Sequence, residues 1–273
     1  MKIAVIIRSC GRPLLLQRAL ASVRSQVLRP TEIVFVCIGQ AGAEAVEGAD
    51  VSFAEVRKVQ VREGMARGAA LNAGIQASSA DWIAILDDDD TWLSEFLSEA
   101  AAAAARLAET DDLVGVVART EVVYERLVTN TVEVCRTEVM NPTLVAVSVE
   151  DLFEANRFTI NAAVWRRSAM QELGGFREQL DVLEDWEFNF RAAVHGRLHV
   201  IPVALARYHR RPPEDAQPNS LVEEHDRMAG RLRAEWRRQG IRGRPGLIEN
   251  IGVLAKLRQR WRRFRERSRW KTG

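Results

Sequence analysis

The sequence contains little cysteine and no long hydrophobic run, and both absences exclude classes of protein. Only three cysteines occur in 273 residues: Cys10, Cys37 and Cys135. Their odd number and wide spacing argue against a disulfide framework or a zinc site and favour a reducing compartment. No apolar stretch is long enough to cross a bilayer, and the first residues, ended by Arg8, are too short for a signal peptide. We therefore expect a cytoplasmic protein.

The net charge of +2 hides a strong asymmetry along the chain. From Asp226 to Gly273 there are 16 Lys or Arg and 4 Asp or Glu, a local net of +12. The preceding 225 residues carry 23 basic and 33 acidic residues, a net of −10. An acidic body with a basic C-terminal arm suggests contact with a polyanionic surface.

Strand and helix patterns alternate through the first half of the chain. Periodicity predicts strands at 2–7, 32–38, 51–61 and 82–86, and helices at 13–26 and 64–78. This order implies an α/β fold with a mostly parallel central sheet and helices on both faces. In such sheets, ligands bind beyond the carboxyl ends of the strands.

The second half is predicted to mix short helices with antiparallel strands. The expected helices are 91–107, 149–155, 168–173 and 184–194, and the expected strands are 113–117, a hairpin within 122–134, 159–165 and edge strands over 198–208 interrupted by Pro202. The rest of the chain reads as basic helix with a break at 240–246.

The most informative segment is the predicted strand 82–86, because four aspartates follow it directly: Asp87, Asp88, Asp89 and Asp90. Carboxylates crowded at the end of a buried strand repel one another unless positive charge lies among them. A divalent cation with oxygen ligands is one such counter-charge, and a nucleotide diphosphate would complete its coordination. The alternative is that Asp90 and its neighbours are charges at the start of the helix predicted for 91–107.

Four ordered motifs resemble the family 2 glycosyltransferases, which have the GT-A fold. They are the segments 68–75, 82–90, 174–176 and 183–187, and the resemblance covers about residues 1–211. It implies a Rossmann-like catalytic domain at 1–215, with a donor half of about 1–118 and an acceptor half of about 119–215. Residues 216–273 then form a basic helical extension.

The resemblance also implies a site and a mechanism. Ser9, Arg67, Asp87 and Asp88 would contact a nucleotide-sugar donor, and Asp89 with His209 would bind Mg²⁺ or Mn²⁺. Asp185 would be the general base that deprotonates an acceptor hydroxyl during an inverting transfer. Taken without the resemblance, Asp185 reads as a capping charge at a helix start, and a lone histidine such as His209 is more often structural than a ligand.

Two departures from the family pattern leave the nucleotide open. The turn at 37–40 carries no carboxylate where relatives have an aspartate that often reads the base, and the segment 8–11 lacks the usual aromatic residue. A donor other than a UDP-sugar is therefore an alternative. The absence of a Gln-x-x-Arg-Trp signature favours transfer of a single sugar. A catalytically impaired binding or scaffold protein is the second hypothesis, and a nucleotidyltransferase is the third.

The basic arm has an amphipathic pattern that suggests a partner. Its apolar residues recur at helical spacing: Leu247, Ile251, Leu254, Leu257, Trp261 and Phe264. One interpretation is binding to the anionic inner face of a membrane, which suits a glycan, lipid-linked or other hydroxyl acceptor in surface glycan or glycolipid assembly. The other is packing on the domain or on a second subunit of a homodimer. Nucleic-acid binding is not expected because the body is acidic.

Overall fold

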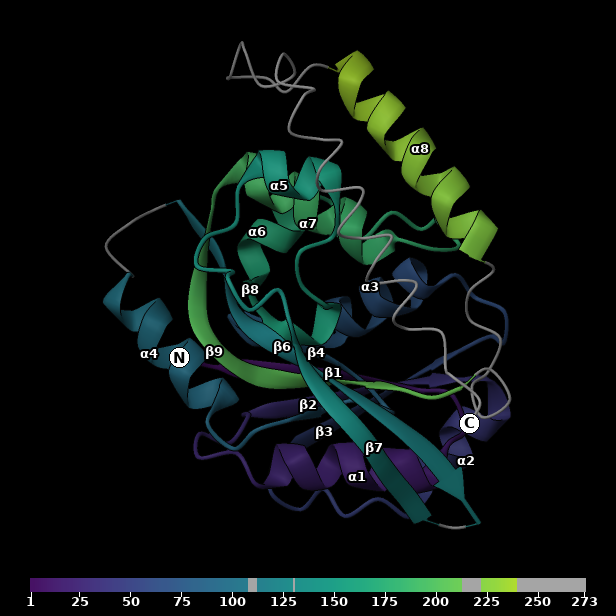
Figure 1. Cartoon of the computed structure of the whole chain (residues 1–273). Helices are drawn as coiled ribbons and strands as arrows, with labels where there is room; N and C mark the ends of the chain where they lie inside the picture. Colours follow the sequence, from purple (N-terminus) through teal and green to yellow (C-terminus); the bar gives the residue numbers. More distant parts are fainter. Residues whose placement is uncertain (108–111, 130, 213–221, 240–273) are drawn as a thin grey trace.

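One twisted sheet extends through the whole molecule (Figure 1). The computed structural model describes all residues except 108–111, 130, 213–221 and 240–273. Within this part of the chain the strands are β1 (Ile3–Ser9), β2 (Glu32–Ile38), β3 (Glu55–Val61), β4 (Trp82–Asp87), β5 (Thr91–Trp92), β6 (Leu113–Val128), β7 (Thr131–Met140), β8 (Ala163–Arg166) and β9 (Arg197–Arg210).

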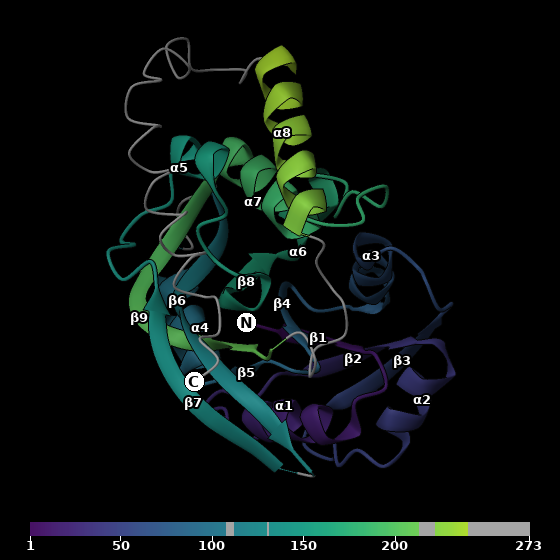
Figure 2. The same ribbon diagram turned by 45° about the vertical axis from the view of Figure 1, so that its right-hand side comes forward.

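Helices cover both faces of this sheet, as Figures 1 and 2 show. They are α1 (Pro13–Arg24), α2 (Gly39–Glu47), α3 (Arg67–Ala77), α4 (Phe96–Arg106), α5 (Val149–Glu154), α6 (Arg167–Glu172), α7 (Glu184–His195) and α8 (Val222–Gln239). Helix α3 lies on one side of strands β1 to β3, and α1 and α2 lie on the other. Helices α5, α6 and α7 gather on the same side as α3, and α8 lies against them.

The strand order is β3-β2-β1-β4-β8-β6-β9-β5, with β7 paired to β6 alone. Strands β1 to β4 are mutually parallel, and β6 is parallel to β9. Strand β8 runs antiparallel between β4 and β6. The predicted α/β fold with a mostly parallel sheet is therefore confirmed.

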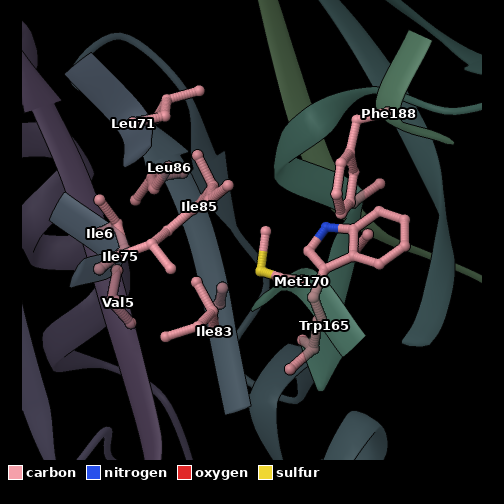
Figure 3. Close-up of a cluster of buried hydrophobic side chains, with 14 of the residues drawn as sticks. Val5, Ile6, Leu71, Ile75, Ile83, Ile85, Leu86, Trp165, Met170 and Phe188 are labelled. Atoms are coloured by element: carbon pink, nitrogen blue, oxygen red, sulfur yellow. The ribbon is translucent and has the colours of Figure 1, made fainter. Parts of the chain in front are cut away.

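The core lies on both faces of β1 and β4, whose residues are almost all fully buried. Strands of parallel sheets are covered on both faces, which explains their unbroken apolar sequences. Figure 3 shows the side chains around β4, including Ile83 and Ile85. Leu71 of α3 lies near one side of this strand, and Trp165 of β8 lies on the other. Strand β4 is thus held on both faces by close packing, and the aspartates follow directly at its carboxyl end.

The prediction of a helix over residues 91–107 is wrong for its first five residues. Thr91 and Trp92 form the short strand β5, which pairs with β9, and α4 begins only at Phe96. The Trp92 indole explains this start, because it stacks on Phe96 with centroids 4.7 Å apart and its Nε1 donates to the Asn161 carbonyl at 2.7 Å. Asp90 is therefore not the cap of a helix.

Two further elements differ from their predictions. The hairpin extends beyond the predicted 122–134 at both ends: β6 (Leu113–Val128) includes the strand predicted for 113–117, and β7 ends only at Met140. The segment containing Pro202 is not an edge pair but one continuous strand, β9, between β6 and β5. Its register with β6 slips between Ile201 and Ala204. Proline, which donates no backbone hydrogen bond, is tolerated at such irregular positions.

Helix α8, the first part of the basic extension, packs against the body. Trp236 is buried and stacks on Phe190 of α7, with centroids 3.8 Å apart. Arg233 donates to the carbonyls of Phe153 and Glu154 at the end of α5, where a helix presents unpaired acceptors. The amphipathic pattern at 247–264 lies outside the described residues. Within the described part of the chain, no helix is long and apolar enough to span a membrane.

Gly74 of α3 should resist substitution, although alanine favours a helix by about 1 kcal/mol over glycine. A Cβ at this position would lie 2.6 Å from Cγ2 of Val36 and 2.7 Å from Cγ2 of Ile6. We expect Gly74→Ala to lower the free energy of unfolding by about 1–3 kcal/mol, measured by denaturant titration. Gly230→Ala on α8 is the control, because a Cβ added there would have no neighbour within 4 Å. Equal effects of the two substitutions would contradict this packing argument.

Candidate active site

Asp87 ends β4, and the other three aspartates lie between β4 and β5, at the carboxyl end of the parallel strands. We call residues 87–90 the acidic turn. Because β1 and β4 are parallel neighbours, Arg8 stands opposite Asp87 in the register. A cation is thus supplied by the adjacent strand at the position where the carboxylates begin.

Asp87 is buried between two arginines. Its carboxylate lies 2.8 Å from Nη2 of Arg8 and 3.4 Å from Nη2 of Arg67. Burial by itself would raise the pKa of Asp87, but the charges of Arg8 and Arg67 outweigh it and hold that pKa below its ordinary value. Asp87 is therefore kept as a carboxylate at neutral pH.

Arg12 lies between the next two aspartates. It pairs with Asp88, which also accepts the backbone N–H of Cys10 at 2.8 Å, and its Nη1 lies 2.7 Å from Oδ2 of Asp89. Burial raises the pKa of Asp88 in spite of these partners. Asp89 is the part-exposed member of the turn, and its Oδ2 also pairs with Arg211.

Asp90 is buried and accepts hydrogen bonds from two neutral donors. It accepts the backbone N–H of His209 at 2.9 Å and the side-chain amide of Asn161 at 3.0 Å. Burial, followed by the charges of Asp89 and Asp87, raises the pKa of Asp90 well above its ordinary value. Its role in the structure is to tie the turn to β9, which corrects the helix-capping interpretation.

A buried glutamate lies behind the turn. Glu125 of β6 has no exposed surface, and its carboxylate meets Arg18 at 2.7 and 3.1 Å, Arg211 at 2.6 Å and Nδ1 of His209 at 2.6 Å. Burial favours a raised pKa for Glu125, but the hydrogen bonds from His209 and Arg18 prevail and lower it to about 2. Glu125 is therefore an anion held by two arginines and a histidine that donate to it.

Both ring nitrogens of His209 have partners. Because the Glu125 carboxylate can only accept, Nδ1 of His209 donates to it. Nε2 lies 2.8 Å from the hydroxyl of Thr91. Burial lowers the pKa of His209, which favours the neutral ring and an Nε2 that accepts from Thr91. The lone pair that a metal would need is thus engaged in this arrangement.

Asp185, the expected base, is the second residue of α7. The helix follows Leu183, whose backbone has a φ of 65°. One oxygen of Asp185 accepts the side-chain amide of Asn156 at 2.8 Å, and the other accepts the backbone N–H of Trp186 at 2.7 Å. Desolvation, and then the charge of Glu184, raise the pKa of Asp185 to about 6. A part-exposed carboxylate with that pKa can accept a proton near neutral pH.

Arg67 connects the two acidic groups. At the start of α3, its Nη2 faces Asp87 and its Nε lies 3.1 Å from Glu184. The structure therefore brings together Arg67, Asp87 and the Glu184–Asp185 pair, which the sequence placed almost 100 residues apart. Ser9 lies at the end of β1, but its hydroxyl is buried and donates to the Gly42 carbonyl at 3.1 Å.

The acidic turn is compatible with a divalent cation at Asp89. Carboxylate oxygens are ligands that Mg²⁺ and Mn²⁺ prefer, and Asp89 is the part-exposed carboxylate of the turn. No cluster of three or more His, Cys, Asp or Glu side chains suited to a metal occurs within the described residues. A cation at Asp89 would therefore take most of its ligands from a diphosphate and water.

Comparisons with known proteins identify the family. The model of glycosyl transferase family 2 matches residues 4–171, which is more than half of the chain. The chain belongs to glycosyl transferase family 2. It is 26% identical over 243 residues to the uncharacterized glycosyltransferase YwdF of Bacillus subtilis (strain 168), covering 85% of this chain and 83% of that protein. This family 2 member is therefore an enzyme, a glycosyltransferase.

Solved structures show the same fold. The S. aureus TarS 1–349 structure in complex with UDP has a TM-score of 0.58 and 17% identity, and the match covers 86% of this chain and 65% of that one. The complex of the same fragment with UDP-GlcNAc also has a TM-score of 0.58, with 17% identity and coverage of 85% and 66%. The match spans 39% of the longer TarS structure. The predicted GT-A fold is thus confirmed for the glycosyltransferase described here.

Several site residues were not identified from the sequence: Arg8, Arg12, Arg18, Glu125, Asn156 and Asn161. One of them had a usable signal. Arg8 follows a predicted strand that neighbours the strand before the aspartates, so the parallel register alone places it opposite Asp87. Glu125 had none, because a glutamate in an alternating hairpin strand reads as a solvent-facing residue.

The raised pKa of Asp185 should be visible in folding stability. A carboxyl group whose pKa is higher in the folded state than its ordinary value of 3.8 binds its proton more tightly when folded, so raising the pH through this range favours unfolding. Asp185→Asn lacks this group. We expect its melting temperature relative to wild type to increase between pH 4 and about 6.5, and to level off above that. If the melting temperatures of the variant and the wild type changed with pH in parallel over this range, the raised pKa of Asp185 would be contradicted.

Proposed function

We propose that this glycosyltransferase is an inverting enzyme that moves one sugar from a nucleotide-diphosphate sugar to an acceptor hydroxyl. The observation that carries the proposal is the position of Asp185. It is a part-exposed carboxylate with a pKa of about 6, and the neighbouring Glu184 shares Arg67 with Asp87 of the acidic turn. Arg67 thus lies between Asp87, which is expected to bind the donor, and the Glu184–Asp185 pair, which contains the proposed base.

The reaction assigns one task to each part of the site. The Asp185 carboxylate takes the proton of the acceptor hydroxyl as that oxygen attacks the anomeric carbon. The bond between this carbon and the diphosphate oxygen breaks, and its electron pair leaves with the nucleoside diphosphate. Attack from the face opposite the leaving group inverts the anomeric configuration. Asn156 and the Trp186 N–H orient the base, because each contacts one of its oxygens.

The donor is assigned to the acidic turn and the strands beside it. Arg67, Asp87 and Asp88 are proposed to contact it, and so is the end of β1 at Ser9, through its backbone because the hydroxyl is engaged. Asp89 is proposed to hold Mg²⁺ or Mn²⁺, which when bound would neutralise the departing diphosphate. His209 is assigned a supporting role for the turn in place of metal binding, because both its nitrogens have partners.

The acceptor is proposed to enter from the other half of the domain. Residues of about 1–118 form the donor half in this scheme, and those of about 119–215 form the acceptor half, which includes Asn156 and Asp185. The basic pattern at 247–264 supports contact with an anionic membrane surface, and hence a lipid-linked or surface glycan acceptor. A dimer contact made by the same pattern is the alternative.

A nucleotide panel tests the donor assignment. We expect one of UDP, GDP or dTDP to raise the melting temperature, and to do so more strongly with Mn²⁺ present. Because UDP occupies a structure of the same fold, it is tested first. Asp89→Ala should weaken the Mn²⁺-dependent binding about tenfold or more, equivalent to about 1.4 kcal/mol, in calorimetric titration.

The control for this substitution is Asp81→Ala, an exposed aspartate at the opposite end of β4. It should leave nucleotide binding unchanged. No response of the wild-type protein to any of the nucleotides would favour the binding or scaffold hypothesis.

Substitution of the base tests the catalytic step. Asp185→Asn should lower turnover by about 10²- to 10⁴-fold while the affinity for the nucleotide stays within about twofold, because only proton transfer is removed. The rate of the wild-type enzyme should rise with pH through about 6 and then level off, since the base works when deprotonated. Asp181→Asn, an exposed neighbour, is the control. Turnover of Asp185→Asn near that of wild type would refute the base assignment.

A further inference from the structure

Two arginines and a histidine from separate parts of the chain donate hydrogen bonds to the buried carboxylate of Glu125. Arg18 comes from α1, His209 from β9, and Arg211 from the residues just after β9. The side chain of Arg211 is only 4% exposed, and that of Glu125 is not exposed at all. At Glu125 the β6–β7 register slips, so that Cys135 is passed over in the pairing. Such bulges often redirect side chains beside functional sites.

Each of these three donors also contacts the acidic turn or the residue after it. Arg18 donates through Nη2 to the backbone carbonyl of Asp89 at 2.7 Å, and Arg211 pairs with the Asp89 carboxylate. His209 donates its backbone N–H to Asp90 at 2.9 Å, and its Nε2 meets Thr91 at 2.8 Å. Among the described residues Glu125 makes no hydrogen bond or ion pair with the turn itself, so its link to the turn runs through Arg18, Arg211 and His209.

We propose that Glu125 is a positioning residue for donor binding. By fixing Arg18, Arg211 and His209, it sets the backbone and side chain of Asp89 before the diphosphate arrives. This inference rests on the proposed function, in which the acidic turn receives the donor. A preset turn needs no reorganisation on binding, which is the general advantage of an ordered site.

The negative charge of Glu125 is the property on which this arrangement depends. A carboxylate accepts from Arg18, Arg211 and His209 at once, and the two arginines also contact the backbone or side chain of Asp89. Glutamine has the same size, but its NH₂ group is a donor and would meet a donor of one of these three residues. Glu125→Gln should therefore release Arg211 or Arg18 and loosen the turn without changing the volume of the site.

Hydrogen exchange tests the positioning role without any ligand. In Glu125→Gln, we expect amide exchange in the peptide covering 86–93 to be at least about threefold faster than in wild type. The matched control is Glu32→Gln. Glu32 is also a buried carboxylate that pairs with an arginine, Arg57, at 2.6 Å, but it begins β2 and so lies at the amino end of the parallel strands, opposite the acidic turn. Exchange in the 86–93 peptide should be unchanged in this control.

Nucleotide titration tests the link to the donor. With UDP, GDP and dTDP in the presence of Mn²⁺, the affinity for the nucleotide that binds wild type should fall about tenfold in Glu125→Gln and stay unchanged in Glu32→Gln. Arg211→Gln should weaken binding similarly. Adding Glu125→Gln to the Arg211→Gln variant should then lower the nucleotide affinity much less than Glu125→Gln lowers it in the wild-type protein, because the two residues act through one bridge. Arg211→Gln also serves if Glu125→Gln fails to fold, with the same exchange and titration expected.

The outcomes separate this inference from the proposed function. If wild type binds a nucleotide and Glu125→Gln binds it equally well, the positioning role is overturned while the donor assignment stands. If wild type binds none of the nucleotides, the proposed function fails, and exchange in the 86–93 peptide still decides whether Glu125 holds the turn. Unchanged exchange in that peptide for both Glu125→Gln and Arg211→Gln overturns the inference.

Discussion

Electrostatic repulsion among adjacent carboxylates is the constraint around which this fold is organised. Four aspartates leave the end of a buried strand, and charges so close in a poorly solvated region require counter-charges. The structure supplies them as arginines from distant segments: Arg8 of β1, Arg12 before α1, Arg67 of α3 and Arg211 after β9. The sequence alone suggests a divalent cation as the source of this charge. Protein side chains already provide a large part of it.

The fold of the first half could largely be predicted because β1, β2 and β4 are short, mostly apolar runs between turns. Strand β2 has the predicted bounds, Glu32–Ile38, and β4 differs by one residue. The second half resisted prediction for a physical reason. Strands β6 and β9 are long, bent and irregular in register, and β5 has only two residues. Their form depends on tertiary pairing, which local periodicity does not report.

The site was partly predictable as well. Asp87, Asp89 and Asp185 could be named because they lie in motifs that resemble a known family, and Arg67 brings the two groups together in space. The residues behind them could not be named. Glu125 is buried among Arg18, Arg211 and His209 from other elements, and none of those contacts leaves a trace in its local sequence.

Leu183, which precedes α7, is a leucine in left-handed backbone, a conformation that costs a residue with a Cβ about 1–3 kcal/mol. Its side chain packs against the hydrophobic core, so apolar contact offsets this strain. Glycine there would relax the backbone but remove the contact, and valine would keep some contact while fitting the conformation worse. Leu183, which takes no part in the chemistry, therefore fixes the direction in which Glu184 and Asp185 enter α7.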